Sequence, residues 1–284
     1  MLRFLIILLL FTSCNCRGNN KRRHAAEPAR PPAFRFDTHS PATVYRLPEK
    51  LNEISGISPV SESLIACIAD EKGIVYFYDM RLREIVHEIR FTDKGDFEDL
   101  VVTGDVIYVL NSNGEIWTIA QYMDAKRTVS SSRLQIEQPF ELEGLCAKDT
   151  YLLTAAKFYH NKKRNSRTLL PVWPVSLPSM QVAAPLFLIP DNVGDISKPN
   201  LPFHTSAICF DSTANEFLLL STFTKLLLRC STSGEIIQRI VLPENLFTQP
   251  EGLCITAGGQ LLISNEGKEG KATVIVFNPK KNQQ

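Results

Sequence analysis

Gln249-Pro-Glu-Gly-Leu253 opens a strand-like run near the end of the chain, and four earlier segments begin in a similar way. In each segment an acidic or polar residue stands just ahead of a small residue and an aliphatic one. The five segments are Glu53-Ile-Ser-Gly-Ile57, Glu98-Asp-Leu100, Glu143-Gly-Leu145, Ser206-Ala-Ile208 and Glu251-Gly-Leu253. Counted between the aliphatic residues, the copies are 43, 45, 63 and 45 residues apart. A period of about 40 to 50 residues is typical of β-propeller blades.

The sequence between these copies favours strands over helices. Short β-forming runs, such as 106–110 and 274–277, alternate with turn residues such as Asn113-Gly114, and no helical period is sustained. Repeated antiparallel sheets leave exposed edges unless the architecture closes on itself. We therefore predict an all-β, five-bladed β-propeller over residues 44–279. We also expect residues 44–47 to pair near 274–277 and close the ring.

Composition narrows the classes of partner. Among 284 residues, 31 Lys and Arg balance 30 Asp and Glu, which gives a formal net charge of +1. A chain without a basic surplus has no electrostatic footprint for nucleic acid, so nucleic-acid binding is not expected. Five cysteines lie in the body of the chain without the paired spacing of a zinc site, and we expect them in the core: Cys67, Cys146, Cys209, Cys230 and Cys254.

The first residues resemble a bacterial export signal. A short basic start leads into an apolar run at 4–11 that is too short to span a bilayer as a helix. Phe11-Thr-Ser-Cys14 follows and resembles a lipobox, with Phe11 in place of the usual leucine. We predict a lipoprotein signal peptide at 1–13, lipidation of Cys14 and attachment to a membrane through that lipid anchor. The alternative is an ordinary secretory signal with a chance cysteine.

A polar, proline-rich segment at 14–43 is predicted to be a tether, and 280–284 a C-terminal tail. These features predict a location in the bacterial cell envelope, on the outer membrane or facing the periplasm. The interval of 63 residues before Ile208 carries an insertion that starts near His160. Two interpretations of this insertion stay open, a partner-binding flap and an extended outer hairpin of its blade.

The repeated acidic residues form the first candidate site. If each copy begins the innermost strand of a blade, Glu53, Glu98, Glu143 and Glu251, with Ser206 in the fourth place, converge at the entrance of a central channel. Clustered carboxylates repel one another unless a cation or a raised pKa relieves them. Oxygen donors without thiolates or paired histidines suit calcium. In the alternative, each glutamate accepts backbone N–H bonds and binds no metal.

A second set of positions follows 10 to 13 residues further on and differs from blade to blade. Glu71 and Glu266 are acidic, whereas Lys157 is basic, which favours an asymmetric polar pocket that includes Lys157, Ser206 and His204. A single salt bridge between Lys157 and one glutamate of the ring is the plainer interpretation.

Taken together, these segments resemble the motifs of the SdiA-regulated (YjiK-like) family of bacterial envelope proteins across about residues 45–279. The matching segments are Glu53-Ile-Ser-Gly-Ile57, Asp70-Glu71, Asp96-Phe-Glu-Asp99, Phe140-Glu-Leu-Glu-Gly-Leu145, Gln249-Pro-Glu-Gly-Leu253 and Ser264-Asn-Glu266. The resemblance implies a five-bladed propeller with a calcium site and no well-established catalytic activity. Glu98, Glu143 and Glu251 are then the leading metal candidates, followed by Glu53, Glu71 and Glu266. Asp99 departs from the family pattern, where glycine is usual.

Two functions follow from these observations. The first is a non-catalytic, membrane-anchored, calcium-binding propeller that acts as a binding or scaffold module for an envelope protein, a glycan or a small ligand. It is favoured because the sequence lacks nucleophile and metalloprotease motifs. The alternative is a calcium-dependent hydrolase of the lactonase, esterase or phosphatase type. Glu71, Glu266 or His204 would then be the base, and Lys157 would stabilise an oxyanion.

Overall fold

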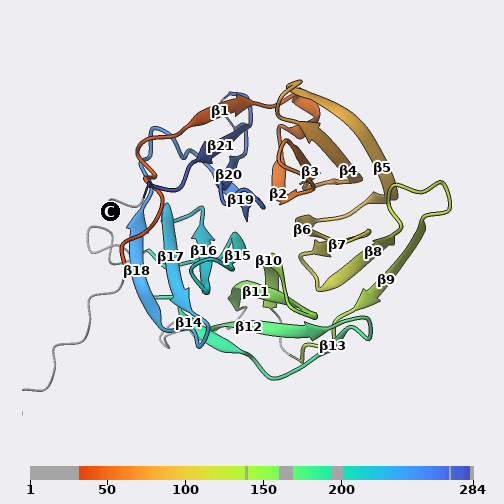
Figure 1. The fold of residues 1–284 in the computed structure, drawn as a ribbon. Helices are drawn as coiled ribbons and strands as arrows, with labels where there is room; N and C mark the ends of the chain where they lie inside the picture. The colour runs from red at the N-terminus through yellow and green to blue at the C-terminus, as the bar shows by residue number, and fades with distance from the viewer. Residues whose placement is uncertain (1–31, 138–139, 160–168, 194–200, 269, 282–284) are drawn as a thin grey trace, which may run out of the picture. The chain divides into compact units, whose positions relative to one another are not determined.

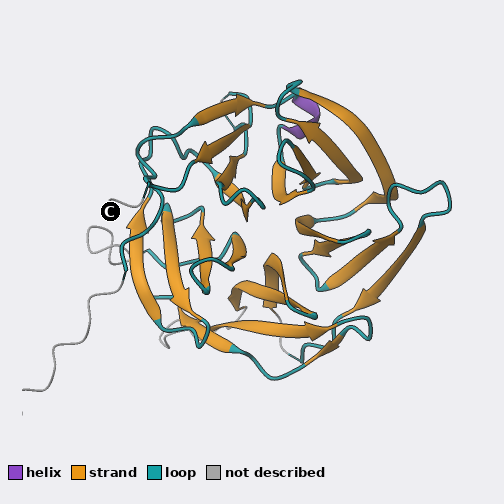
Figure 2. Ribbon diagram, viewed as in Figure 1, coloured by secondary structure: helices purple, strands orange, loops and turns teal. Residues whose placement is uncertain are grey.

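The computed structural model describes residues 32–137, 140–159, 169–193, 201–268 and 270–281. The chain divides into two units, Met1–Ala33 and Phe34–Gln284, and the second unit holds the strands. These strands form five antiparallel sheets arranged around a common axis, so the fold is a five-bladed β-propeller (Figure 1). Strands and turns make up nearly all of it, as Figure 2 shows, with one short 3-10 helix, η1 (Glu49–Leu51).

Each of the first four blades is built from strands that follow one another along the chain. Blade 1 contains β2 (Ile54–Pro59), β3 (Leu64–Ala69), β4 (Lys72–Asp79) and β5 (Glu84–Lys94). Blade 2 contains β6 (Phe97–Thr103), β7 (Val106–Asn111), β8 (Glu115–Ala120) and β9 (Thr128–Arg133). Blade 3 contains β10 (Phe140–Lys148), β11 (Tyr151–Tyr159), β12 (Leu169–Ser176), β13 (Gln181–Val182) and β14 (Phe187–Pro190). Blade 4 contains β15 (Ala207–Asp211), β16 (Glu216–Ser221), β17 (Leu226–Ser231) and β18 (Ile236–Val241).

Blade 5 combines the two ends of the folded unit. It contains β19 (Pro250–Ile255), β20 (Leu261–Asn265), β21 (Thr273–Phe277) and β1 (Thr43–Arg46). Strand β1 pairs antiparallel with β21, with Val44 opposite Ile275 and Tyr45 opposite Val274. The predicted closure of the ring is therefore confirmed. It removes the sheet edge that β21 would otherwise expose.

The core lies between neighbouring blades. The innermost strands β2, β6, β10, β15 and β19 contact one another in that order, and β19 returns to β2. Buried side chains form clusters across the blade boundaries, such as Phe77 with Phe97 between blades 1 and 2, and Leu220 with Ile263 between blades 4 and 5. Because the inner strands of each sheet are buried on both faces, strands such as β3, β16 and β17 read as nearly continuous apolar runs.

The innermost strands share one irregularity near their starts. In blades 1, 2 and 3 a single residue of the inner strand has no partner on the second strand: Ser55, Glu98 and Glu143. In blade 5, Glu251 and Gly252 together oppose one residue. A β-bulge of this kind turns its extra side chain away from the regular pleat. The bulge corrects the predicted ring, because Ser55 and not Glu53 holds the position equivalent to Glu98.

The boundary of the tether also needs correction. Phe34 and Phe36 are buried against blades 4 and 5, and Phe36 forms an isolated bridge with Pro279. The packed part of the chain therefore begins at Phe34, ahead of the predicted start at 44. Lys280, assigned to the tail, donates its backbone N–H to Arg35 O at 2.6 Å. The predicted signal peptide, Cys14 and most of the tether lie outside the described residues.

The described part of the insertion belongs to blade 3. Strand β12 pairs with β13 near one end and with β14 near the other, so this part forms the outer edge of the blade. Residues 160–168, where the insertion starts, lie outside the described ranges. The five cysteines of the body are buried and free, as expected for core residues. Within the described ranges, none of the helical segments is long and apolar enough to cross a bilayer.

Candidate functional site

Three carboxylates meet where blade 2 packs against blade 3. Glu98 stands at the bulge of β6, Glu143 at the bulge of β10, and Glu141 two residues earlier on β10. One carboxylate oxygen from each residue lies within 4.8 Å of one from both others. Glu143 is buried and the other two are half-buried. This carboxylate cluster, Glu98, Glu141 and Glu143, is the centre of the candidate site.

Lys157 on β11 faces two members of the carboxylate cluster. Its Nζ forms an ion pair with Glu143, and a second with Glu141 at 3.3 Å. Burial alone would lower the pKa of Lys157, but Glu143 and Glu141 outweigh burial and the net direction is upward. The ammonium therefore stays charged and neutralises part of the cluster. The predicted salt bridge between Lys157 and a glutamate of the ring is present.

Glu251 belongs to the same electrostatic neighbourhood. Its Oε2 accepts a hydrogen bond of 3.0 Å from Thr222 Oγ1 in blade 4. Its charge raises the pKa of Glu143, and the charge of Glu98 raises the pKa of Glu251 in turn. Of the three leading metal candidates, Glu98 and Glu143 therefore meet in the carboxylate cluster, whereas Glu251 is not part of it and acts on it through its charge.

These carboxyl groups hold their protons unusually strongly. Burial, followed by the charges of Glu143 and Asp96, raises the pKa of Glu98 to about 9. Burial raises the pKa of Glu143 to about 8 against the opposing effect of Lys157, and it raises the pKa of Glu251 to about 8. Near neutral pH the cluster therefore carries fewer negative charges than its count of glutamates suggests. A cation that binds there must displace protons.

A second acidic group lies where blade 1 meets blade 2. The Asp70 and Asp96 carboxyl groups are hydrogen-bonded to each other, and Ser112 Oγ donates to Asp96. Burial, then this bond and the charge of Asp96, raises the pKa of Asp70 to about 6. Asp96 also contributes to the raised pKa of Glu98, so the two acidic groups interact.

The remaining metal candidates lie apart from the carboxylate cluster. Glu53 and Glu71 are exposed, and their charges act on Asp70. Glu266 is half-buried and accepts a hydrogen bond from Gln249 Nε2. Its pKa is raised first by burial and then, after the opposing effect of Lys268, by Glu53. These three therefore surround the site without joining its centre.

Ser206 and His204 differ in their relation to the site. Ser206 is buried, and its hydroxyl donates to Pro250 O at 3.2 Å, so it ties blade 4 to blade 5. The His204 ring stacks on Phe223 with centroids 5.5 Å apart, and the centroid of the Phe158 ring also lies 5.5 Å from that of His204. Burial, followed by Lys157, lowers the pKa of His204, so it is neutral at pH 7. An aromatic wall of Phe158, His204 and Phe223 thus lies near Lys157.

Glu141 is the site residue that the sequence analysis missed. The repeat identifies Glu143, which directly precedes Gly144, but Glu141 lies outside the repeated pattern. Side chains at i and i+2 share a face of a regular strand, so the Glu-Leu-Glu pattern was an available indication. Asp96 was likewise present in a quoted motif but absent from the candidate ligands.

Carboxylates are the oxygen donors that calcium prefers, and the carboxylate cluster offers three of them. Calcium takes about six to eight oxygen ligands, so three glutamates would leave positions for water or for a ligand's oxygen atoms. Lys157 competes with a metal because its ammonium already contacts Glu141 and Glu143. The donor set fits a divalent cation that displaces protons and part of the contact with Lys157.

Comparison with known proteins supports the fold. No protein-family model matches the chain, and a search of curated proteins found no match. Among solved structures, a glutaminyl cyclase from Myxococcus xanthus aligns with a TM-score of 0.59 and 12% identity, over 85% of this chain and 97% of that one. A protein of unknown function from Bacteroides thetaiotaomicron aligns with a TM-score of 0.51 and 12% identity, over 75% of this chain and 52% of that one. At such identities the likeness concerns the fold alone.

Proposed function

We propose that this propeller is a calcium-dependent binding module whose carboxylate cluster holds the ion at one end of the propeller axis. The observation that carries the proposal is the approach of Glu98, Glu141 and Glu143 oxygens to within 4.8 Å of one another. At this separation ionised carboxylates repel one another, and the raised pKa values of Glu98 and Glu143 reflect that repulsion together with burial. A divalent cation that displaces their protons would relieve the same repulsion. Lys157 supplies only one positive charge to them.

The position of the cluster suggests how a ligand would be held. Bound calcium would supply a positive charge and open coordination positions for oxygen atoms of a ligand. Beside it, the exposed Phe223 ring and the stacked His204 offer a flat apolar surface. A small ligand or a glycan with oxygen donors and an apolar face matches this combination, since sugar rings have both.

Calorimetry on EDTA-treated protein tests the metal part. We expect calcium to bind with release of protons, detected as a binding heat that depends on the buffer, because the pKa values of Glu98 and Glu143 are raised. Calcium at one hundred times its Kd should stabilise the fold by about 2.7 kcal/mol. Glu141→Gln should weaken binding, whereas the exposed Glu235→Gln should not. Absence of both heat and stabilisation would remove calcium from the proposal.

The cellular setting follows from the sequence. We extend the proposal to a lipoprotein of the bacterial envelope anchored through Cys14, with motifs like those of the SdiA-regulated family. Metabolic labelling with a fatty-acid analogue tests this part. Label in the wild-type protein and none in Cys14→Ser is the expected outcome. Equal labelling of both proteins would contradict it.

A calcium-dependent hydrolase is the second candidate, and the surroundings of Lys157 favour it. His204 is held neutral near Lys157, as a general base requires, while the ammonium could stabilise an oxyanion. The other proposed bases are less suitable, since Glu71 is exposed and Glu266 is bound to Gln249. Bound calcium would polarise a carbonyl or phosphoryl oxygen.

Enzyme assays with a panel of substrates distinguish the binding module from the hydrolase. Lactone, ester and phosphate monoester substrates should be assayed with and without calcium. Turnover that requires calcium and disappears in both His204→Gln and Glu98→Gln would replace the binding module by the hydrolase. Calcium binding without turnover of any of them supports the module.

A further inference from the structure

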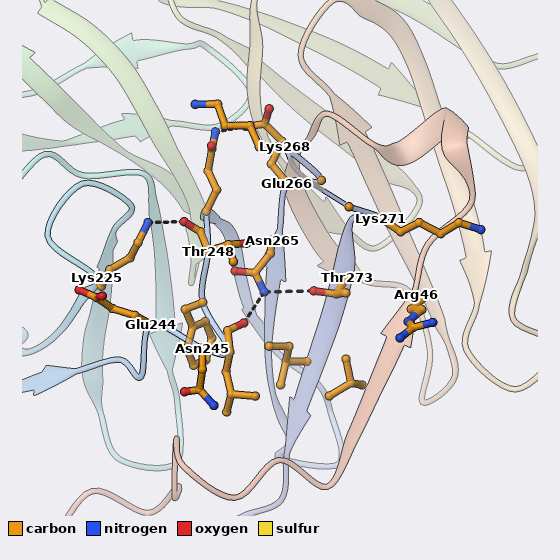
Figure 3. Close-up of a pocket in the computed structure, with 17 residues that line it drawn as sticks. Arg46, Lys225, Glu244, Asn245, Thr248, Asn265, Glu266, Lys268, Lys271 and Thr273 are labelled. Atoms are coloured by element: carbon orange, nitrogen blue, oxygen red, sulfur yellow. Dashed lines mark hydrogen bonds between the residues drawn. The ribbon is translucent and has the colours of Figure 1, made fainter.

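A cavity of about 840 Å³ lies on the blade 5 side of the propeller (Figure 3), and no member of the carboxylate cluster lines it. One wall is the segment that joins β18 to β19, with Leu246 and Thr248. The other is formed by β20, β21, β1 and the loop after β20, with Asn265, Thr273 and Arg46. Ligand sites in proteins commonly have volumes of about 300 to 1,000 Å³, so a small molecule fits.

Asn265 leaves one buried polar atom unsatisfied beside this cavity. Its Nδ2 donates to Leu246 O at 3.2 Å and to Thr273 Oγ1 at 3.1 Å, so both amide hydrogens are used. Its Oδ1 is buried without a hydrogen-bond partner, and the residue is only 3% exposed. A buried acceptor without a donor is unfavourable. A hydroxyl or N–H group in the cavity would satisfy it.

The pairing of the strands places Asn265 in one row across blade 5 with the basic residue Arg46. Thr273 on β21 is the register partner of Asn265 on β20 and also of Arg46 on β1, so the three side chains share one face of blade 5. Neighbouring strands lie about 4.8 Å apart, which places the backbones of Asn265 and Arg46 roughly 10 Å from each other. A polar row therefore runs from the buried acceptor to the exposed guanidinium.

Positive charge gathers at the outer end of this row. Figure 3 shows Arg46 and Lys271 together on the side of Thr273 opposite Lys225 and Glu244. The side chains of Arg46 and Lys271 form no hydrogen bond or ion pair with any residue that the structure describes. Lys225, by contrast, donates to Thr248 O. Two cations that have no partner among the described residues, at one end of a cavity, are suited to an anionic group.

Both walls are held in place before any ligand binds. Asn52 fixes the loop after β20, since its Nδ2 donates to Gly267 O at 3.0 Å and its O accepts from Gly267 N at 2.8 Å. Asn265 bridges the two walls through Leu246 and Thr273. A site held in this way loses little conformational freedom when it is filled.

We propose that this cavity binds a hydroxylated organic anion, the class to which acidic sugars belong, with a hydroxyl donating to Asn265 Oδ1 and the acidic group at Arg46 and Lys271. The site is separate from the carboxylate cluster and requires no metal. The buried acceptor selects for a hydroxyl group, and the two cations select for a negative charge.

Nuclear magnetic resonance on the full chain in EDTA tests the inference with glucuronate as the probe. The side-chain amide signals of Asn265 report on the buried end of the cavity. We expect glucuronate at millimolar concentration to shift these signals. Arg46→Gln and Lys271→Gln should each raise the Kd by about tenfold, as for the loss of one charge-assisted hydrogen bond. The exposed Lys126→Gln is the matched control and should bind as the wild type does.

Two further compounds, glucose and acetate, test the two parts of the proposal separately. Glucose binding as tightly as glucuronate would overturn the role of the cations. Acetate shifting the Asn265 signals equally well would overturn the role of the hydroxyl group. No shift with glucuronate would mean that Asn265 Oδ1 is satisfied by water alone, which also overturns the proposal. Because EDTA is present throughout, each result is independent of calcium at the carboxylate cluster.

Discussion

Asp99 Oδ2 accepts a hydrogen bond of 2.8 Å from the backbone N–H of Leu145, so a side chain of blade 2 holds the innermost strand of blade 3. Its Oδ1 accepts from Leu100 N, also at 2.8 Å. The repeat places glycine at the same position in three other blades, because the next strand passes close by. A Cβ on Gly144 would approach Ile208 Cγ2 to 2.9 Å. Asp99 is accommodated at this position because its carboxyl group accepts a hydrogen bond from the backbone of the neighbouring strand, at Leu145.

Replacing Asp99 by alanine should therefore weaken the junction between blades 2 and 3. Blade 4 carries Ala207 at the equivalent position, so the substitution is sterically acceptable. Two buried N–H groups would lose their acceptor, and we expect a loss of about 1–3 kcal/mol in the free energy of unfolding. Urea denaturation measures it, with Ala207→Gly as the control. Unchanged stability would mean that burying the Asp99 carboxyl group is as unfavourable as its two hydrogen bonds are favourable.

The stability of the calcium-free protein should fall as the pH rises through the range of about 5 to 9. The pKa of Glu98 is about 9 and those of Glu143 and Glu251 about 8, against 4.5 for an ordinary glutamate. The folded state therefore binds more protons than the unfolded state in this range, and stability is lost as these groups ionise.

Thermal unfolding in EDTA at several pH values measures this dependence. Glu98→Gln stays neutral and should flatten the slope across this range, whereas the exposed Glu235→Gln should leave the slope unchanged. A Tm that rises between pH 6 and 9 would contradict the raised pKa values.

Removal of Lys157 should make the protein more dependent on calcium. In Lys157→Met the carboxylates of Glu141 and Glu143 lose their ammonium partner. We expect a loss of about 2 kcal/mol without calcium, below the range for a fully buried pair because Lys157 is partly exposed. Calcium should then raise the Tm of the variant more than that of the wild type. An equal rise in both proteins would show that Lys157 and the metal do not share the cluster.

Arg229 and Glu216 form a second buried ion pair, which lies within blade 4. Arg229 donates from Nε and Nη2 to the two carboxylate oxygens of Glu216, at 2.8 and 2.9 Å. Arg229→Met would leave the Glu216 charge buried without its partner and should lower the free energy of unfolding by about 3–5 kcal/mol.

The double variant Arg229→Met, Glu216→Leu should recover most of that loss, because no unpaired charge remains in the sheet. Chemical denaturation of the two single variants and the double variant forms a closed cycle. A double variant as unstable as Arg229→Met alone would show that packing, not charge, accounts for the loss.

The fold could be predicted because the repeat appears directly in the sequence. Strand-forming runs such as 106–110 and 274–277 became β7 and β21, and the predicted pairing of residues 44–47 with the last blade is present. The start of the packed region was placed too late, at 44. Phe34 and Phe36 lie among prolines and polar residues, and their burial depends on a surface between blades 4 and 5 that exists only after folding.

The site could be predicted only in part. Glu98, Glu143 and Glu251 were identified because each stands two residues ahead of the aliphatic residue of its repeat copy. Glu53 was grouped with them, although the bulge gives that position to Ser55. Bulges change which residues share a face, and no pattern in a single strand reveals them. The contact of Glu141 with Lys157 likewise depends on the bulged pairing of β10 with β11.

The pairing of β1 with β21 imposes an order on folding during synthesis. Thr43 leaves the ribosome long before its partner Val276 exists, by more than 10 s at about 5–20 residues per second. Until then the first strand has no sheet to join, and the last blade cannot be completed. During that interval the unpaired backbone of the first strand can pair with strands of other nascent chains. The protein is therefore most exposed to aggregation just before its synthesis is finished.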